Sequence, residues 1–210
     1  MKGVFISFEG IEGTGKSTQA RLLAEYLGGR GYAVVLTAEP GGTPISFKIR
    51  ELLLSLESRD MDHVTELLLY NAARVQHIRD VIGPALLQGS VVITDRFSDS
   101  TLAYQGYGRG IERKTIDAID TAATGGMKPD LTLLLDVDVE TGLRRNRRAH
   151  KQDRLELEDI AFHRNVQKGF HEIAAAEPER VRIVPCAGSI ATVHEVVREC
   201  VMMFLAQKGI

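Results

Sequence analysis

One segment near the N-terminus limits what this chain can fold into more than any other feature. Residues 10–17 read Gly-Ile-Glu-Gly-Thr-Gly-Lys-Ser and fit the pattern G-x-x-x-x-G-K-[ST]. An apolar strand is expected just before it, at residues 4–8, and apolar residues recur at helical spacing just after it. A glycine-rich turn before a helix also arises by chance, but this order of strand, loop and helix is what a phosphate-binding loop requires. The segment therefore predicts a site for a nucleoside triphosphate.

Each part of this loop has a chemical task. The glycines let backbone N–H groups turn inward around a phosphate, and the helix that begins near Lys16 adds the positive end of its dipole. We expect Lys16 to reach the β- and γ-phosphates of ATP, and Ser17 to offer its hydroxyl to Mg²⁺. The residues expected to bind ATP are Gly10, Ile11, Glu12, Gly13, Thr14, Gly15, Lys16, Ser17 and Thr18.

Strands alternate with helices along the rest of the chain, and the strands are apolar runs rather than alternating patterns. Such runs indicate a parallel sheet covered on both faces. We therefore expect an α/β protein of three layers, with a five-stranded parallel sheet, in one domain over residues 1–210. The further strands are expected at 33–36, 91–95, 131–137 and 181–184, and helices at 45–56, 61–87 (with a break at 83–84), 114–123, 156–176 and the C-terminus. In the last helix, one apolar face is expected from Ile190, Val193, Val197, Cys200, Val201 and Phe204.

Charge and cysteine content narrow the class of protein. The net charge is −2, whereas a nucleic-acid binder of this size is usually more basic. The positive charge is gathered at Arg144, Arg145, Arg147 and Arg148, which fits a small polyanion better than a long one. Cys186 and Cys200 are too few for a disulfide scaffold, and we expect both to be reduced core residues of a cytoplasmic protein. No signal segment or membrane span is expected either.

The loop alone does not separate a kinase from a GTPase, a motor or a transport ATPase. The Asn-Lys-x-Asp pattern expected of a GTPase is absent from the sequence, and the chain is short for a motor. Asp95 ends the third expected strand, where ligands collect in an open α/β sheet, so it is expected to orient the Mg²⁺ shell. Residues 98–110 are rich in Ser, Gly and Tyr and are expected to form a functional loop. Tyr70 and Arg74 share a helix face and suit a nucleobase, although such a pair is often merely exposed.

Together these motifs resemble a known family, the bacterial thymidylate kinases. The resemblance covers nearly the whole chain, and residues 95–110 are its most specific part. The matching segments, in order, are 9–17, Glu39-Pro40-Gly41-Gly42-Thr43, Ala72-Ala73-Arg74, Asp95-Arg96-Phe97, Ala103-Tyr104-Gln105-Gly106, Arg109-Gly110 and Pro129-Asp130-Leu131-Thr132.

The resemblance implies a kinase that passes the γ-phosphoryl group of ATP to dTMP. Tyr70 then takes the place of an aromatic residue, commonly Phe, that stacks on thymine. Arg74 is implied to contact the thymine carbonyl and approach the acceptor phosphate, and Thr101 and Gln105 to hydrogen-bond the base.

The sugar and phosphate contacts also follow from the resemblance. Tyr104 is implied to crowd the sugar 2′ position and so favour deoxyribose, and Glu9 to meet the 3′-hydroxyl. Arg50 and Arg96 are implied to bind the acceptor phosphate, and Glu39 belongs to the same dTMP site. Many relatives have Arg where this chain has Ala38.

The resemblance further implies a mobile lid at about residues 144–156 that carries the catalytic arginine. The phosphate loop itself has Glu12 and no arginine, which matches the lid-arginine type of the family. Arg145, Arg147, Arg148 and Arg154 are the expected lid residues, Arg147 and Arg148 the candidates for catalysis, and Arg144 a candidate ATP contact together with residues 186–188. With Lys16, Asp95 and Arg96, these two candidates complete the expected catalytic set.

The acceptor is a phosphate oxygen that is already ionised near neutrality, so no strong general base is expected. Cations and alignment must instead bring two anions together. The family also implies a homodimer through helices near residues 61–88 and 97–125. Two alternatives stay open: another nucleoside monophosphate kinase, of adenylate or uridylate type, and a nucleotide-sensing module with little turnover.

Overall fold

The sheet is the frame of the molecule. The computed structural model describes residues 3–148 and 153–210. Within them, five parallel strands form one sheet in the order β2-β3-β1-β4-β5. This confirms the predicted α/β architecture. The strands are β1 (Val4–Glu9), β2 (Val34–Ala38), β3 (Val91–Asp95), β4 (Leu131–Asp136) and β5 (Val181–Pro185).

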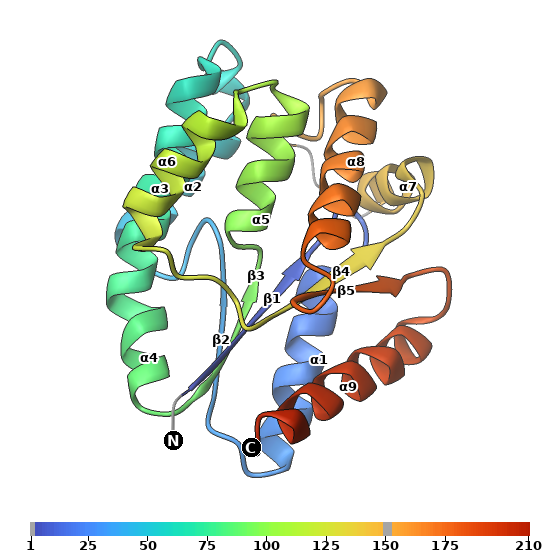
Figure 1. Ribbon diagram of the computed structural model, residues 1–210. Coiled ribbons are helices and arrows are strands. Elements are labelled where there is room, and N and C mark those ends of the chain that lie inside the picture. The colour runs from blue at the N-terminus through green and yellow to red at the C-terminus, as the bar shows by residue number, and fades with distance from the viewer. Residues whose placement is uncertain (1–2, 149–152) are drawn as a thin grey trace.

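Helices cover both faces of the sheet (Figure 1). The first and last helices, α1 (Lys16–Gly29) and α9 (Ile190–Gln207), lie together on one side, while α4 (Gly83–Leu87) and α8 (Ile160–Ala176) lie on the other. The remaining helices are α2 (Pro44–Leu54), α3 (His63–His77), α5 (Ser98–Thr101), α6 (Arg113–Thr124) and α7 (Val139–Arg148).

The central strand β1 shows why the sheet needs both layers. All six of its residues are buried, as its apolar sequence predicts. Ile6 and Phe8 belong to the core that also contains Leu23 of α1. Phe5 faces the other way and packs edge-on against Phe97, at 4.9 Å between ring centroids. Apolar burial on both faces therefore holds the end of β1, and with it the phosphate loop, in a fixed place.

The segment 98–110 is not the loop that its composition suggested. It forms α5 and then a π-helical turn, η3 (Leu102–Gly108), which packs closely against α8. Ala103, Tyr104 and Gln105 are buried there. The glycines allow this contact, since a Cβ at Gly108 would lie 2.6 Å from the Phe162 ring. Tertiary packing therefore overrides the loop-like composition.

Three other boundaries differ from expectation. Residues 61–87 contain α3, a π-helical turn at Ile78–Ile82 and then α4, because Pro84 lacks the N–H that would continue the ladder. Helix α8 begins at Ile160 rather than 156, where Asp159 caps it through the Phe162 N–H. In α9 the buried face consists of Val193, Val197, Val201 and Leu205, and Ile190 is exposed.

Both cysteines are free. Cys186 is buried, as expected of a core residue, whereas Cys200 is only half-buried. Among the described residues, no helix has the length and apolar character that crossing a membrane demands.

Candidate active site

The carboxyl ends of β1 and β3 bring the two predicted halves of the site together. The strands pair in parallel, with Phe8 opposite Asp95, so the phosphate loop after β1 lies beside the segment after β3. A cavity of about 1310 Å³ opens at this edge. It is lined by most of the expected residues, among them Glu12, Gly13, Thr14, Gly15, Lys16, Ser17, Thr18, Glu39, Arg50, Tyr70, Arg74, Asp95, Arg96, Thr101, Tyr104 and Gln105.

The phosphate loop has the backbone that its glycines predict. Gly10, Gly13 and Gly15 have positive φ, and a Cβ on Gly13 would lie 2.0 Å from the carbonyl oxygen of Gly142. The Lys16 ammonium donates to the carbonyls of Gly10 and Ile11, at 3.0 and 2.7 Å. Burial and the nearby Arg96 charge lower the pKa of Lys16 to about 8. An anionic phosphate in the cavity would favour its charged form.

Ser17 and Asp95 converge as expected of a magnesium site. The Ser17 hydroxyl donates to one oxygen of Asp95, and the other oxygen, Oδ1, is buried with no hydrogen-bond partner. Hydroxyl and carboxylate oxygens suit Mg²⁺, which usually takes one or two protein ligands together with phosphate oxygens. Within residues 3–148 and 153–210, no cluster of three or more His, Cys, Asp or Glu side chains could hold a metal alone. The residues present fit a magnesium ion that is bound together with a nucleotide.

Arg96 joins the phosphate loop to the other half of the cavity. Its φ of 75° lies in the left-handed region, which is unusual for a residue with a side chain. The guanidinium donates to the Gly10 carbonyl at 3.0 Å, to Ser100 at 2.9 Å and to Glu12 at 3.1 Å. It also lies over the Tyr104 ring, 4.9 Å from its centroid, and donates to the phenol oxygen. A cation is therefore held between the expected donor and acceptor sites.

Of Glu9 and Glu12, the two carboxylates nearest the start of the phosphate loop, Glu12 is the one that lines the cavity. Glu12 accepts from Arg96 and from the Tyr104 hydroxyl, and its Oε2 lies 3.5 Å from His163 Nδ1. Burial opposes its ionisation, but His163, Arg96 and Lys16 together lower the pKa of Glu12 to about 2. Glu9 does not line the cavity. The expected contact of Glu9 with an acceptor hydroxyl therefore has no support in the geometry.

Glu9 instead holds the turn that carries Arg96. It is fully buried and accepts from the Phe97 N–H at 2.7 Å and the Ser100 hydroxyl at 2.5 Å. Burial and the nearby Asp99 charge raise the pKa of Glu9 to about 8. Glu9 therefore acts from outside the cavity, by fixing the turn that positions Arg96.

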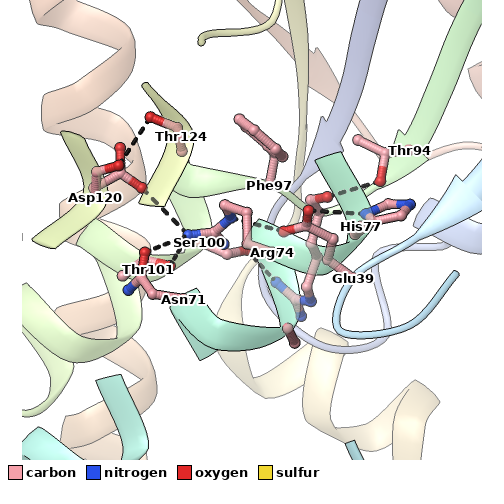
Figure 2. A network of polar contacts seen from close by, with 12 residues as sticks. Glu39, Asn71, Arg74, His77, Thr94, Phe97, Ser100, Thr101, Asp120 and Thr124 are labelled. Atoms are coloured by element: carbon pink, nitrogen blue, oxygen red, sulfur yellow. Dashed lines mark hydrogen bonds and ion pairs between the residues drawn. The ribbon is translucent and has the colours of Figure 1, made fainter. Parts of the chain in front are cut away.

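Arg74 is buried, so the reading of an exposed pair with Tyr70 is wrong. Its guanidinium donates to Glu39 at 2.8 Å and to Thr101 at 2.9 Å, and Asp120 of α6 lies 3.3 Å away (Figure 2). Figure 2 also shows His77 on the far side of Glu39, at 3.0 Å. Three other chain segments, which carry Glu39, Thr101 and Asp120, thus fix one cation at the cavity wall. His77 and Asp120 gave no sequence signal of this role.

The other expected acceptor residues line the same part of the cavity. Tyr70 is half-buried, and burial together with the Glu66 charge raises its pKa, so the phenol stays protonated. Gln105 donates to Glu66 at 2.8 Å, and Arg50 donates to the Pro40 carbonyl at 2.9 Å. Glu66 escaped the sequence analysis, although its position four residues before Tyr70 places it on the same helix face.

The arginine-rich segment divides into different environments. Arg145 lines the cavity and donates to the Cys186 carbonyl at 3.1 Å, beside the loop expected to meet adenine. Arg144 and Arg147 are exposed and border a separate depression beside Glu140 and Ile160. Arg145 is thus better placed than Arg144 for an ATP contact.

The rest of the expected lid is described only in part. Arg148 is the last residue of α7, and residues 149–152 lie outside the described part of the chain. Arg154 is buried, does not line the cavity and pairs with Glu66 at 2.5 Å. Its expected place on a lid that faces the phosphates is therefore not what the structure gives.

The fold and this cavity define a class: a P-loop protein whose phosphate loop faces a second, cationic pocket of the kind a phosphoryl acceptor would use. Comparison with known proteins narrows the class. The family model described as "Thymidylate kinase" matches residues 8–197. The chain is 50% identical to a thymidylate kinase of Pelobacter propionicus over 93% of this chain and 92% of the relative. It is also 50% identical to one of Pseudomonas fluorescens over 94% of each chain.

A solved structure agrees with the sequences. The crystal structure of thymidylate kinase from Ehrlichia chaffeensis superposes with a TM-score of 0.79 at 38% identity, over 96% of this chain and 99% of that one. The chain belongs to the thymidylate kinase family. The resemblance read from residues 9–17 and 95–110 is thereby confirmed.

The raised pKa of Glu9 predicts a specific pH dependence of stability. Between pH 4.5 and about 8 the unfolded chain loses the Glu9 proton and the folded chain keeps it, so Glu9 lowers the free energy of unfolding as pH rises. Glu9→Gln removes this component, by up to about 1.4 kcal/mol per pH unit. Urea unfolding at pH 5, 6.5 and 8 should show that the free energy of unfolding of the variant increases relative to that of the parent as pH rises. A constant difference between the two proteins would contradict the buried, protonated carboxyl.

Proposed function

We propose that this protein transfers the γ-phosphoryl group of ATP to dTMP and releases ADP and dTDP. One observation carries the proposal: the phosphate loop and the cationic pocket with Tyr70, Arg74 and Arg96 line the same cavity. The geometry supports two substrates placed phosphate to phosphate. The family match supports thymidylate as the acceptor.

The chemistry needs cations more than a base. The acceptor phosphate of dTMP has a second pKa of about 6, so its attacking oxygen is ionised at neutral pH. The difficulty lies in bringing two anions together and in stabilising charge on the moving phosphoryl group. Lys16 and the N–H groups of residues 13–18 would hold the donor phosphates. Arg96 would hold the acceptor phosphate against them.

Ser17 and Asp95 would hold Mg²⁺ together with the phosphates of ATP. When bound, the ion would neutralise phosphate charge and orient the γ-phosphoryl group. The buried, unpaired Asp95 Oδ1 supports this assignment. Arg145, Arg147 and Arg148 stay candidates for the cation that stabilises charge on the transferred phosphoryl group. Arg145 lines the cavity.

The acceptor nucleoside would lie between α3 and η3. Tyr70 offers an aromatic face, and Arg74, Thr101 and Gln105 offer polar groups for a base edge. Tyr104 is fixed by Glu12 and Arg96, so its ring is a rigid wall beside the place of the sugar. A rigid ring there would disfavour an added 2′-hydroxyl. Glu12, which lines the cavity and accepts from the Tyr104 hydroxyl, would accept a hydrogen bond from the sugar.

We also propose the domain organisation, location and partners of the enzyme. Residues 1–210 act as one catalytic domain in a cytoplasmic protein. No contact with nucleic acid or membrane is required. A net charge of −2 and a cavity of nucleotide size support small-molecule substrates.

Selectivity among monophosphates tests the acceptor directly. ADP formation from Mg-ATP should be measured with dTMP, dUMP, UMP, AMP, GMP and CMP offered separately. We expect dTMP to give the highest kcat/KM, with UMP disfavoured because Tyr104 excludes the 2′-hydroxyl. Selectivity for another monophosphate would support a nucleoside monophosphate kinase but contradict dTMP as its acceptor. No stimulation by any of them would favour a nucleotide sensor.

We also propose that the enzyme is a homodimer through α3. This helix exposes Val64, Leu68 and Val75, which are spaced so that they share one side of the helix. Exposed apolar side chains gathered on one side of a helix are typical of interfaces between subunits. Light scattering should give twice the chain mass of 23.1 kDa. A single-chain mass, or a dimer unaffected by Leu68→Glu, would contradict this interface.

A further inference from the structure

A cluster of buried charges lies just behind the acceptor end of the cavity. At its centre is Glu66 of α3, which is fully buried. Its carboxylate accepts from Gln105 at 2.8 Å, from Arg109 at 3.1 and 3.2 Å, and pairs with Arg154 at 2.5 Å. We call these four residues the Glu66 cluster.

The charges in the cluster are balanced. The side chains of Arg109 and Arg154 are 7% and 5% exposed, so neither is solvated freely. Glu158 pairs with Arg109 at 2.6 Å, which gives two carboxylates for two guanidinium groups. Burial opposes the ionised form of Glu66, but hydrogen bonds from Arg109 and Gln105 hold its pKa below the ordinary value. Removing one partner would leave a buried charge uncompensated, so the cluster has one favoured arrangement.

The members of the cluster belong to different parts of the site. Gln105 lines the cavity beside Tyr70. Arg154 precedes Leu155 and Glu156, which also line the cavity, and it lies two residues after the segment that the structure does not describe. Arg154 also donates to the Leu53 carbonyl at the end of α2 at 3.2 Å. One carboxylate therefore fixes an acceptor-pocket side chain and one end of the arginine-rich segment.

This arrangement argues against a direct catalytic role for Arg154. Its guanidinium is engaged by Glu66 and Leu53, and it does not line the cavity. A residue that contacted the moving phosphoryl group would have to face the phosphate loop. Arg154 faces the opposite way, toward α2 and α3.

We propose that Glu66 and Arg154 are positioning residues, which link the placement of Gln105 against the acceptor base to the placement of residues 153–156. The proposal rests on the proposed function, because that function assigns the acceptor base to the side of the cavity where Gln105 lies. Occupation of the acceptor pocket then affects the placement of residues 153–156 through Glu66. A substitution that removes the contacts of Arg154 with Glu66 therefore weakens acceptor binding, although Arg154 does not line the cavity.

Binding of dTMP alone tests this link. Calorimetry should compare the parent with Arg154→Met, which keeps the length of the side chain and removes its charge. We expect the dTMP Kd to rise about three- to tenfold although Arg154 touches no part of the cavity. Arg113→Met, at an exposed arginine of α6 that pairs with Asp117, is the matched control and should leave the Kd unchanged.

A double-mutant cycle separates this link from a general loss of structure. In a Gln105→Leu background, the effect of Arg154→Met on the dTMP Kd should shrink by at least about threefold, because the two changes act through the same carboxylate. Independent effects that multiply would overturn the proposal. If Arg154→Met does not fold, Arg154→Lys, which keeps the charge, serves in the same cycle with a smaller expected effect.

The kinetic readout distinguishes positioning from catalysis. Arg154→Met should raise KM for dTMP more than it lowers kcat, with KM for ATP nearly unchanged. A loss confined to kcat, with dTMP binding intact, would overturn the proposal and make Arg154 a catalytic arginine. If the parent itself failed to bind dTMP, the proposed function would fail instead, so the two failures are distinguishable.

Discussion

The arrangement of the site depends on the hydrogen bonds and ion pair that the Arg96 guanidinium makes. Arg96 follows the last residue of β3 and has a left-handed backbone conformation. Its guanidinium donates to the Gly10 carbonyl at the start of the phosphate loop. It also contacts Glu12 of the same loop and Tyr104, which lines the other half of the cavity. Without the Arg96 cation, less positive charge would balance the buried carboxylate of Glu12. Less positive charge would also offset the repulsion between the phosphates of the two substrates. The same group therefore organises the folded site and suits the proposed reaction.

The backbone turn that carries Arg96 is held by the buried carboxylate of Glu9, which does not line the cavity. Glu9 binds the Phe97 N–H and the Ser100 hydroxyl, and so fixes the turn that aims the guanidinium. Phe97 in turn packs on Phe5 of the neighbouring strand and beneath Arg74, 5.1 Å from the guanidinium carbon. The apolar core and the polar site are thus continuous. Such support is what holds charged groups in place before a substrate binds.

Much of this could be predicted from local sequence patterns. The phosphate loop, the five strands and the convergence of Ser17 with Asp95 follow from apolar runs and from the position of motifs at strand ends. What could not be predicted in this way depends on contacts between distant segments. Residues 98–110 read as a loop because they are rich in Ser, Gly and Tyr, yet packing against α8 makes residues 98–108 helical. The role of Glu9, the burial of Arg74 and the distance of Arg154 from the cavity each depend on partners far away in the sequence.

The most direct test of the central role of Arg96 is its replacement by alanine. Arg96→Ala should lower kcat/KM for dTMP by at least about a hundredfold, since removing one positioned donor for transition-state charge costs that much in comparable sites. Thermal unfolding should show that the variant still folds, ATP binding should be largely kept, and Arg96→Lys should recover part of the loss. Arg113→Ala, at an exposed arginine, is the control for loss of charge alone. Near-parental turnover by a folded Arg96→Ala protein would contradict the account.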